Sequence, residues 1–125
     1  MKILSIRIKN LASLSDEHFI DFESAPLAHA GLIAIVGKTG AGKSTILDAM
    51  CLALFNRGPR LKDSDGKLKD VDGSELLTNS PLTVLRRGTG HGFAELCFIA
   101  QDQKRYLARW EIKRARENPN GKLQS

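Results

Sequence analysis

The chain opens on a regular alternation of apolar and polar residues. Residues 2 to 10 have the two-residue period of a half-buried β-strand. The apolar positions on one face are Leu4, Ile6 and Ile8. Serine and aspartate then predict a turn from Asn10 to Asp16, and a second short strand is expected from His18 to Phe22.

Two longer apolar segments follow in the middle of the chain. Residues 31 to 36 form a continuous apolar run that predicts a third, buried strand. Residues 45 to 55 predict a helix that is apolar on nearly every side and therefore buried on most sides. The face expected to point to the core comprises Ile46, Met50, Ala53 and Leu54. Asp48 is the one charge inside this helix, and we interpret it as solvated or locally paired.

Periodicity is lost between residues 56 and 80. Turn dipeptides such as Gly58-Pro59 and Asp72-Gly73 alternate there with lysine and arginine, which predicts one long loop. Loops of this length are often functional. Two interpretations remain open: a solvated polar insertion, or a loop that contacts a nucleotide base or DNA.

The last third of the chain predicts a β-hairpin with its turn at Asp102-Gln103. One strand has an apolar face of Ala94, Leu96, Phe98 and Ala100, and the returning strand has one of Tyr106, Ala108, Trp110 and Ile112. Arg105, Leu107, Arg109, Glu111 and Lys113 then lie on the solvent side. The residues after Ile112 are polar and turn-prone.

A glycine-rich motif stands between the third strand and the helix. The residues are Gly37, Lys38, Thr39, Gly40, Ala41, Gly42, Lys43 and Ser44, which match the phosphate-binding pattern G-x-x-x-x-G-K-[ST]. The three glycines permit positive φ and a close approach of backbone amides to an anion. Lys43 supplies charge for the β- and γ-phosphates, the Ser44 hydroxyl is placed to hold Mg²⁺, and Thr45 adds a hydroxyl near the α-phosphate. The motif therefore predicts binding of ATP with Mg²⁺.

Composition narrows the remaining classes of protein. With 125 residues and 42% hydrophobic content, the chain suits one globular domain with a core. No apolar stretch approaches the roughly 18 residues of a membrane span and no signal sequence is recognisable, so we expect a cytoplasmic protein. Cys51 and Cys97 lack metal-ligand spacing and are expected to be buried, reduced thiols. The net charge of +5 permits a polyanionic partner.

The sequence contains a phosphate-binding motif but lacks the other residues that a hydrolytic site requires. Hydrolysis requires a second carboxylate at the end of an apolar strand. Asp102 is the nearest candidate, but it falls in the hairpin turn beside Lys104 and Arg105. No residue of this chain is therefore assigned a catalytic role.

Several segments together resemble the SMC-like ATPases of DNA repair. They are residues 1 to 11, the glycine-rich motif with the following helix, Gly58 to Leu61, Arg87-Gly88, Arg114 to Arg116 and Pro119 to Gly121. The resemblance implies the N-terminal lobe of an ABC-type ATPase head that is split in sequence. Its C-terminal lobe would return after a long antiparallel coiled coil with a zinc hook and would supply the second carboxylate and the ABC signature. A metal-dependent nuclease subunit, double-stranded DNA ends and hairpins, and head-to-head dimerisation on ATP are the implied partners and substrates.

The resemblance also assigns roles to individual residues. Gly42, Lys43, Ser44 and Thr45 match the family's nucleotide and Mg²⁺ contacts. Arg60, Leu61, Lys62 and Asp63 fall in the loop that reaches toward the base. Ala12 is a departure, because several relatives have an arginine there that contacts phosphate. The family's Q-loop glutamine is expected beyond Ser125, so Gln101 and Gln103 are not that residue.

The predicted fold is an α/β P-loop half-domain: a mixed sheet around the helix, with the antiparallel hairpin forming part of a second sheet. The expected function is ATP binding within a DNA-repair ATPase and nuclease complex. A small-molecule or nucleoside kinase and a non-hydrolysing nucleotide- and DNA-binding module are the alternatives. Arg105, Arg109 and Lys113 share strand parity, which predicts a cationic face for duplex DNA or, alternatively, a solvated sheet face.

Overall fold

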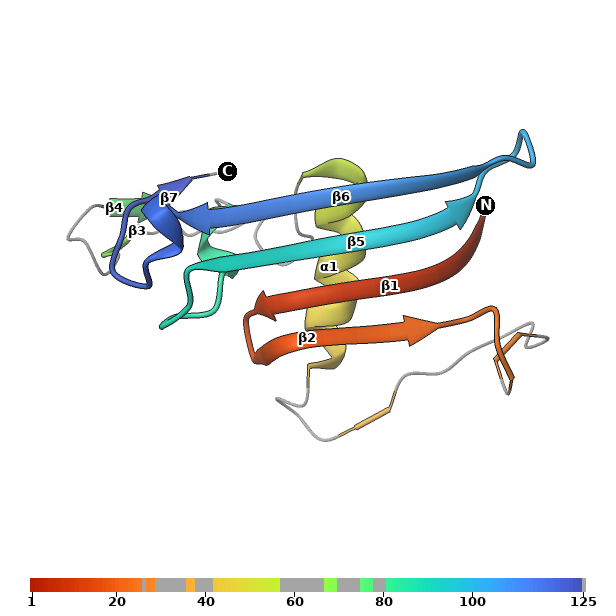
Figure 1. The fold of residues 1–125 in the computed structure, drawn as a ribbon, viewed down its shortest axis with the longest axis horizontal. Coiled ribbons are helices and arrows are strands. Elements are labelled where there is room, and N and C mark those ends of the chain that lie inside the picture. Colours follow the sequence, from red (N-terminus) through yellow and green to blue (C-terminus); the bar gives the residue numbers. More distant parts are fainter. Residues whose placement is uncertain are drawn as a thin grey trace.

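The structure is a computed structural model that describes residues 1–25, 27–28, 36–37, 42–56, 67–69, 75–77 and 81–124. Its strands are β1 (Lys2–Leu11), β2 (Leu14–Asp21), β3 (Lys67–Lys69), β4 (Glu75–Leu77), β5 (His91–Ile99), β6 (Arg105–Arg114) and β7 (Leu123–Gln124). The helix is α1 (Lys43–Phe55), and short 3₁₀ turns occur at Pro81–Val84 and Ala115–Glu117. Figure 1 shows β2, β1, β5 and β6 side by side, with α1 crossing one face of the sheet.

The main sheet has five strands in the order β2-β1-β5-β6-β7, and every neighbouring pair is antiparallel. The alternation predicted for β1 is confirmed, since Leu4, Ile6 and Ile8 are each at most 2% exposed and face the core. A sheet with α1 on one side and solvent on the other requires this two-residue period.

The predicted hairpin is confirmed as β5 and β6, with Ala94 opposite Trp110 and Leu96 opposite Ala108. Its assignment to a second sheet is wrong, because β5 also pairs with β1 from Lys9↔Phe93 to Lys2↔Ile99. The periodicity of a strand reports which face is buried and not which strand lies beside it. The parallel part of the predicted mixed sheet depends on residues 31 to 35, which lie outside the described residues.

The predicted helix is confirmed, but its orientation differs from the prediction. The residues buried against the sheet are Thr45, Asp48, Ala49 and Leu52. The predicted face of Ile46, Met50, Ala53 and Leu54 is only partly buried against the core. Leu47 is 55% exposed and Phe55 64%, so burial on most sides was a wrong prediction. The helix has apolar residues on every side, so its sequence does not specify which face points to the core. Packing against the sheet determines that face.

The buried face of α1 also changes the interpretation of Asp48. Its side chain is 5% exposed, so the solvated interpretation is wrong and local pairing remains. Cys51 and Cys97 are half-buried free cysteines and are not buried as predicted.

The turn between β1 and β2 is shorter than predicted. It comprises only Ala12 and Ser13, and Asp16 already lies in β2. Asn10 organises the turn: it has a φ of 51°, its Oδ1 accepts the Asp16 amide at 2.7 Å, and its Nδ2 donates to the His91 carbonyl at 3.0 Å. β2 is largely exposed and therefore accommodates polar residues. These polar residues led to the prediction of a turn where the structure has a strand.

The C-terminal segment is more ordered than its polar composition suggests. Arg114 is 2% exposed, and its Nη1 donates to the Gly121 carbonyl at 3.0 Å. Leu123 in β7 is 9% exposed and closes the core beside β6. The turn at Ala115–Glu117 lies so close to Gly90 that a Cβ there would be 1.8 Å from the Glu117 carbonyl oxygen.

The long loop predicted from 56 to 80 contains regular structure. β3 and β4 pair antiparallel, with Leu68 opposite Leu76, so the prediction of an unstructured segment is wrong there. Three-residue strands are too short for their periodicity to be recognised among turn residues. The residues between 57 and 80 outside these two strands are not among the described residues.

Candidate functional site

The glycine-rich motif leads directly into α1. Gly42 immediately precedes the helix with a φ of 103°, which confirms the positive φ predicted for this glycine. Leu14 from the start of β2 packs over it, and a Cβ at Gly42 would lie 2.5 Å from Leu14 Cδ2. Both conformation and space therefore require glycine at this position. Lys38, Thr39, Gly40 and Ala41 lie outside the described residues.

The first turn of α1 presents the functional groups that the motif predicts. The Lys43 ammonium donates a hydrogen bond to the Gly37 carbonyl, so this side chain folds back along the loop. Ser44 is exposed, whereas Thr45 is 3% exposed and faces the sheet. The site thus combines a cation and a solvent-accessible hydroxyl at one end of the helix.

The helix N-terminus has no competing anion of its own. No side chain caps it, and its first turn contains no acidic residue. Unpaired amides and the positive end of the helix dipole favour a phosphate at such a position. A hydroxyl oxygen is a suitable ligand for Mg²⁺, which usually binds through phosphates and few protein groups. The residues present therefore suit a magnesium-bound polyphosphate.

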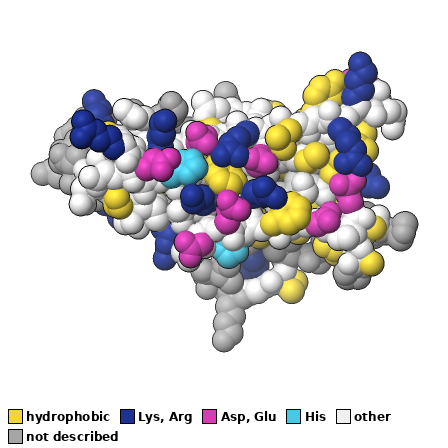
Figure 2. All heavy atoms as spheres, in the orientation of Figure 1, with side chains coloured by type: hydrophobic (Ala, Val, Ile, Leu, Met, Phe, Trp, Pro, Cys, Tyr) yellow, Lys and Arg dark blue, Asp and Glu magenta, His cyan; other side chains and the backbone are white. Residues whose placement is uncertain are grey.

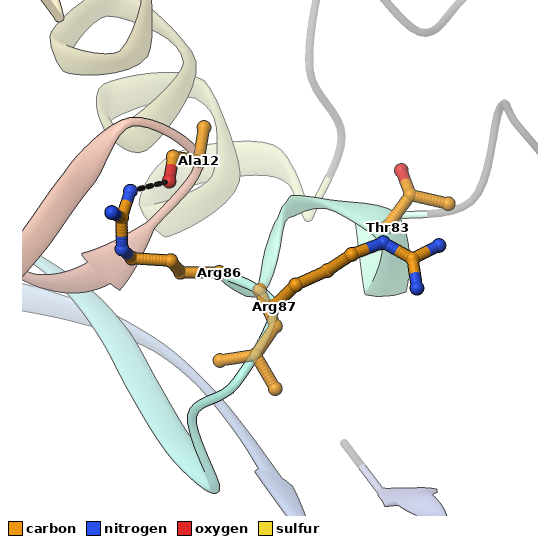
Figure 3. A pocket seen from close by; sticks show the side chains of 5 residues that line it. Ala12, Thr83, Arg86 and Arg87 are labelled. Atoms are coloured by element: carbon orange, nitrogen blue, oxygen red, sulfur yellow. Dashed lines mark hydrogen bonds between the residues drawn. The ribbon is translucent and has the colours of Figure 1, made fainter. Parts of the chain in front are cut away.

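The base-side residues Arg60 to Asp63 lie outside the described residues. Nearer the β1–β2 turn, a surface hollow is lined by Ala12, Thr83, Leu85, Arg86 and Arg87. Arg86 Nη1 donates to the Ala12 carbonyl at 2.9 Å, while Arg87 extends to the opposite side of the hollow (Figure 3). The approach of Arg86 to Ala12 depends on tertiary structure, because the two residues are 74 positions apart in the chain.

The outer face of the sheet carries the three cations predicted to contact DNA. Arg105, Arg109 and Lys113 are all exposed on β6, as their parity requires. Figure 2 shows this face, where basic, acidic and apolar side chains are intermixed. No uniform basic stripe runs along the part of the face that the structure describes.

Carboxylates from two strands and from the segment after β2 explain this mixture. Arg109 pairs with Glu95 of β5 and with Glu111 at 2.8 Å, and its guanidinium lies 4.2 Å from the centre of the Phe93 ring. Arg105 Nη2 lies 2.6 Å from Glu23 Oε1, just after β2. Glu95 lies opposite Arg109 in the pairing of β5 with β6, whereas the approach of Glu23 needs the pairing of β1 with both β2 and β5.

The ion pairs shift the pKa values of Glu111, Arg105 and Arg109 in the direction that favours the charged form of each. The Arg109 hydrogen bond, followed by that of His91, lowers the pKa of Glu111 below its ordinary value. Glu23 raises the pKa of Arg105, and Glu111 raises that of Arg109. The groups are exposed, so each pair contributes little to stability.

Asp102 lies in the turn between β5 and β6, as predicted. Its Oδ2 accepts the Tyr106 hydroxyl at 2.5 Å, and this bond lowers the pKa of the Asp102 carboxyl. Within the described ranges, no three histidine, cysteine, aspartate or glutamate residues are grouped to hold a metal ion. Among those same residues, no helix is long and apolar enough to cross a membrane.

Comparison with known proteins agrees with this geometry. The profile of the family described as "AAA domain" matches residues 5–125. The chain is 54% identical over 125 residues to the SbcC subunit of the nuclease SbcCD from Pseudomonas aeruginosa, covering 99% of this chain and 10% of that protein. It is 50% identical over 127 residues to the protein of the same name from Rhodobacter capsulatus, again covering 10% of it. The "DNA double-strand break repair Rad50 ATPase" of Methanopyrus kandleri is 30% identical over 118 residues. The resemblance to DNA-repair ATPases is thus confirmed, and the chain spans about a tenth of the length of these relatives.

Proposed function

This chain belongs to the AAA domain family, and on that premise we propose that it is the ATP-binding, N-terminal lobe of an SbcC-type DNA-repair ATPase. The observation that carries the proposal is the start of α1. There a left-handed glycine, a lysine and an exposed serine hydroxyl stand at an uncapped helix N-terminus. The similarity of the chain to SbcC over its whole length supports its assignment to the SbcC class of ATPases.

The proposed roles follow the chemistry of each group. Residues 37 to 42 surround the phosphates with amides, Lys43 neutralises the β- and γ-phosphates, and Ser44 holds Mg²⁺. Thr45 contributes near the α-phosphate, and the loop of Arg60 to Asp63 approaches the base. When bound, Mg²⁺ would bridge phosphate oxygens and neutralise their charge.

The larger assembly is part of the same proposal. The C-terminal lobe of the full-length protein completes this head, and two heads dimerise on ATP. The SbcD nuclease subunit is the partner, and the complex acts as exonuclease and endonuclease on double-stranded DNA ends and hairpins in the cytoplasm. The relatives' name, which makes SbcC a subunit of a nuclease, supports this assignment.

Thermal unfolding with and without Mg·ATP tests the nucleotide site. Binding to the native state alone adds about 2.7 kcal/mol at a hundredfold excess over Kd. For a chain of this size we expect the melting temperature to rise by roughly 5 to 15 °C. Lys43→Ala should remove the shift, because it deletes the cation that faces the phosphates.

A matched variant distinguishes loss of the nucleotide site from a general loss of one positive charge. Lys104→Ala removes a lysine that is exposed in the hairpin turn and should keep the full shift. A cooperative melting curve that saturating Mg·ATP leaves unmoved in the unmodified chain would overturn ATP binding. Transfer of phosphate to nucleosides, detected by thin-layer chromatography, would instead support the kinase alternative.

A further inference from the structure

Among the residues that the structure describes, one edge of the main sheet has no paired strand along most of its length. Arg114 N–H donates to the Gly90 carbonyl at 2.8 Å, and at the other end of the hairpin Ala100 N–H donates to the Lys104 carbonyl at 3.1 Å. In an antiparallel ladder the bonding residues alternate. The even-numbered residues of β6 therefore bond to β5, and the amides and carbonyls of Arg105, Leu107, Arg109 and Glu111 point away from it.

β7 covers only the far end of this edge. Its pairs with β6 are Lys113↔Gln124 and Arg114↔Leu123, and Ala115 N–H donates to the Lys122 carbonyl at 2.8 Å. Within the described part of the chain, no strand pairs with the same edge from Arg105 to Ile112. β7 runs antiparallel to β6, so its direction leads along the open edge toward Arg105.

A hollow accompanies the open edge on its core side. It has a volume of about 560 Å³ and lies between β6 at Arg109 to Glu111 and the end of α1 at Leu52 to Asn56. Phe55 stands at this place and is 64% exposed. A strand added to β6 would direct alternate side chains into this hollow.

We propose that the residues after Ser125 in the full-length protein continue β7 as an antiparallel strand along β6 and cover this hollow. The proposal rests on the chain being one part of a longer protein, as proposed above. Continuity with the existing β6–β7 ladder carries it, because each added residue extends a register that is already set. The added strand would also form hydrogen bonds with the backbone groups of β6 that point away from β5.

A second copy of this chain is a poorer occupant of the same edge. An antiparallel β6–β6 pair centred on Arg109 would place Arg109 opposite its own copy and Arg105 opposite Lys113. Like charges directly opposite each other destabilise a ladder. Continuation of β7 does not require any residue of β6 to lie opposite its own copy.

Hydrogen exchange in the full-length protein, resolved to single amides, tests the proposal. The amides of Leu107 and Arg109 should exchange at least about a hundredfold more slowly than in an unstructured peptide. Those of Ala108 and Trp110 bond to β5 and serve as an internal reference for the folded sheet. Protection that disappears on dilution would indicate a second copy and would overturn the proposal.

A proline variant gives an independent readout. Leu107 is 63% exposed, so Leu107→Ala should hardly change the melting temperature. Leu107→Pro removes the outward N–H and blocks an added strand, so it should lower the melting temperature well below that of Leu107→Ala. Equal melting of the two variants together with fast exchange at Leu107 and Arg109 would overturn the proposal. The Mg·ATP shift, measured on the same samples, reports separately on the nucleotide site.

Discussion

At the residue scale, Asn56 joins the helix to the sheet. It ends α1 in the left-handed conformation with a φ of 55°, and its N–H donates to the Leu52 carbonyl at 3.0 Å. Its Oδ1 accepts the indole N–H of Trp110 at 2.8 Å. Asparagine tolerates positive φ better than most residues and offers a side-chain acceptor, so one residue performs both tasks.

Two substitutions separate these contributions of Asn56. Asn56→Gly keeps the left-handed conformation but leaves the Trp110 N–H without its acceptor, which should lower the free energy of unfolding by about 1 to 3 kcal/mol. Asn56→Ala should cost about 1 kcal/mol more, because alanine is strained at positive φ. Urea unfolding followed by the fluorescence of Trp110, the one tryptophan of the chain, measures both. Equal stability of Asn56→Gly and the unmodified chain would show that the indole bond contributes nothing.

Residues whose role is local were predictable from the sequence, and those whose role is tertiary were not. Gly42 was identified because the motif fixes its backbone conformation. Arg114 and Asp48 are buried although their residue types favour solvent. The neighbouring sequence does not indicate which elements pack around them. Arg86 likewise reaches Ala12 across a separation of 74 positions in the chain.

At the scale of elements, alternation predicted β1, β5 and β6 well because one face of the sheet is buried and the other is exposed to solvent. The same reasoning failed for the orientation of α1, whose apolar residues lie all around the helix. It also failed for the neighbours of the hairpin, since the two-residue period says nothing about strand order. For the glycine-rich motif, the start of the helix and the conformation of Gly42 were predicted, whereas the packing of Leu14 over that glycine needed the fold.

The outer face of β6 carries a prediction about DNA. We propose that duplex DNA contacts Arg105, Arg109 and Lys113, and that Arg105 and Arg109 exchange their carboxylate partners for phosphates. Reversing all three to Glu should abolish the binding, while Glu95→Gln should strengthen it by removing one of the two carboxylates that pair with Arg109. The logarithm of the affinity should fall with the logarithm of the salt concentration, with a slope of about −0.9 per phosphate neutralised.

Fluorescence anisotropy with a labelled duplex measures these affinities, and the Mg·ATP melting shift controls for folding. Glu17→Gln removes a carboxylate from β2 and serves as the matched control for Glu95→Gln. Unchanged affinity in the triple variant would place the DNA contact elsewhere, in the loop of residues 57 to 69 or in the C-terminal lobe.

At the scale of the whole molecule, the structure looks like one part of a larger head. Leu47 and Phe55 leave apolar surface on α1 exposed, and no strand in the described ranges pairs with the outer edge of β6 from Arg105 to Ile112. Such surfaces are typical of contacts with further protein. The proposed C-terminal lobe and the continuation of β7 account for both, and we interpret the domain as incomplete alone.

This incompleteness leads to the prediction that the 125-residue chain binds ATP without hydrolysing it. Hydrolysis needs a carboxylate that positions Mg²⁺ and the attacking water beside the γ-phosphate. Of the two carboxylates considered, Asp48 in α1 is buried against the sheet, and Asp102 is held by Tyr106 in the hairpin turn. Phosphate release by the purified chain should therefore equal that of its Lys43→Ala variant, whereas full-length protein should show turnover that Lys43→Ala removes. Steady turnover by the short chain that depends on Lys43 would contradict the half-site and favour a self-sufficient kinase or nucleotide hydrolase.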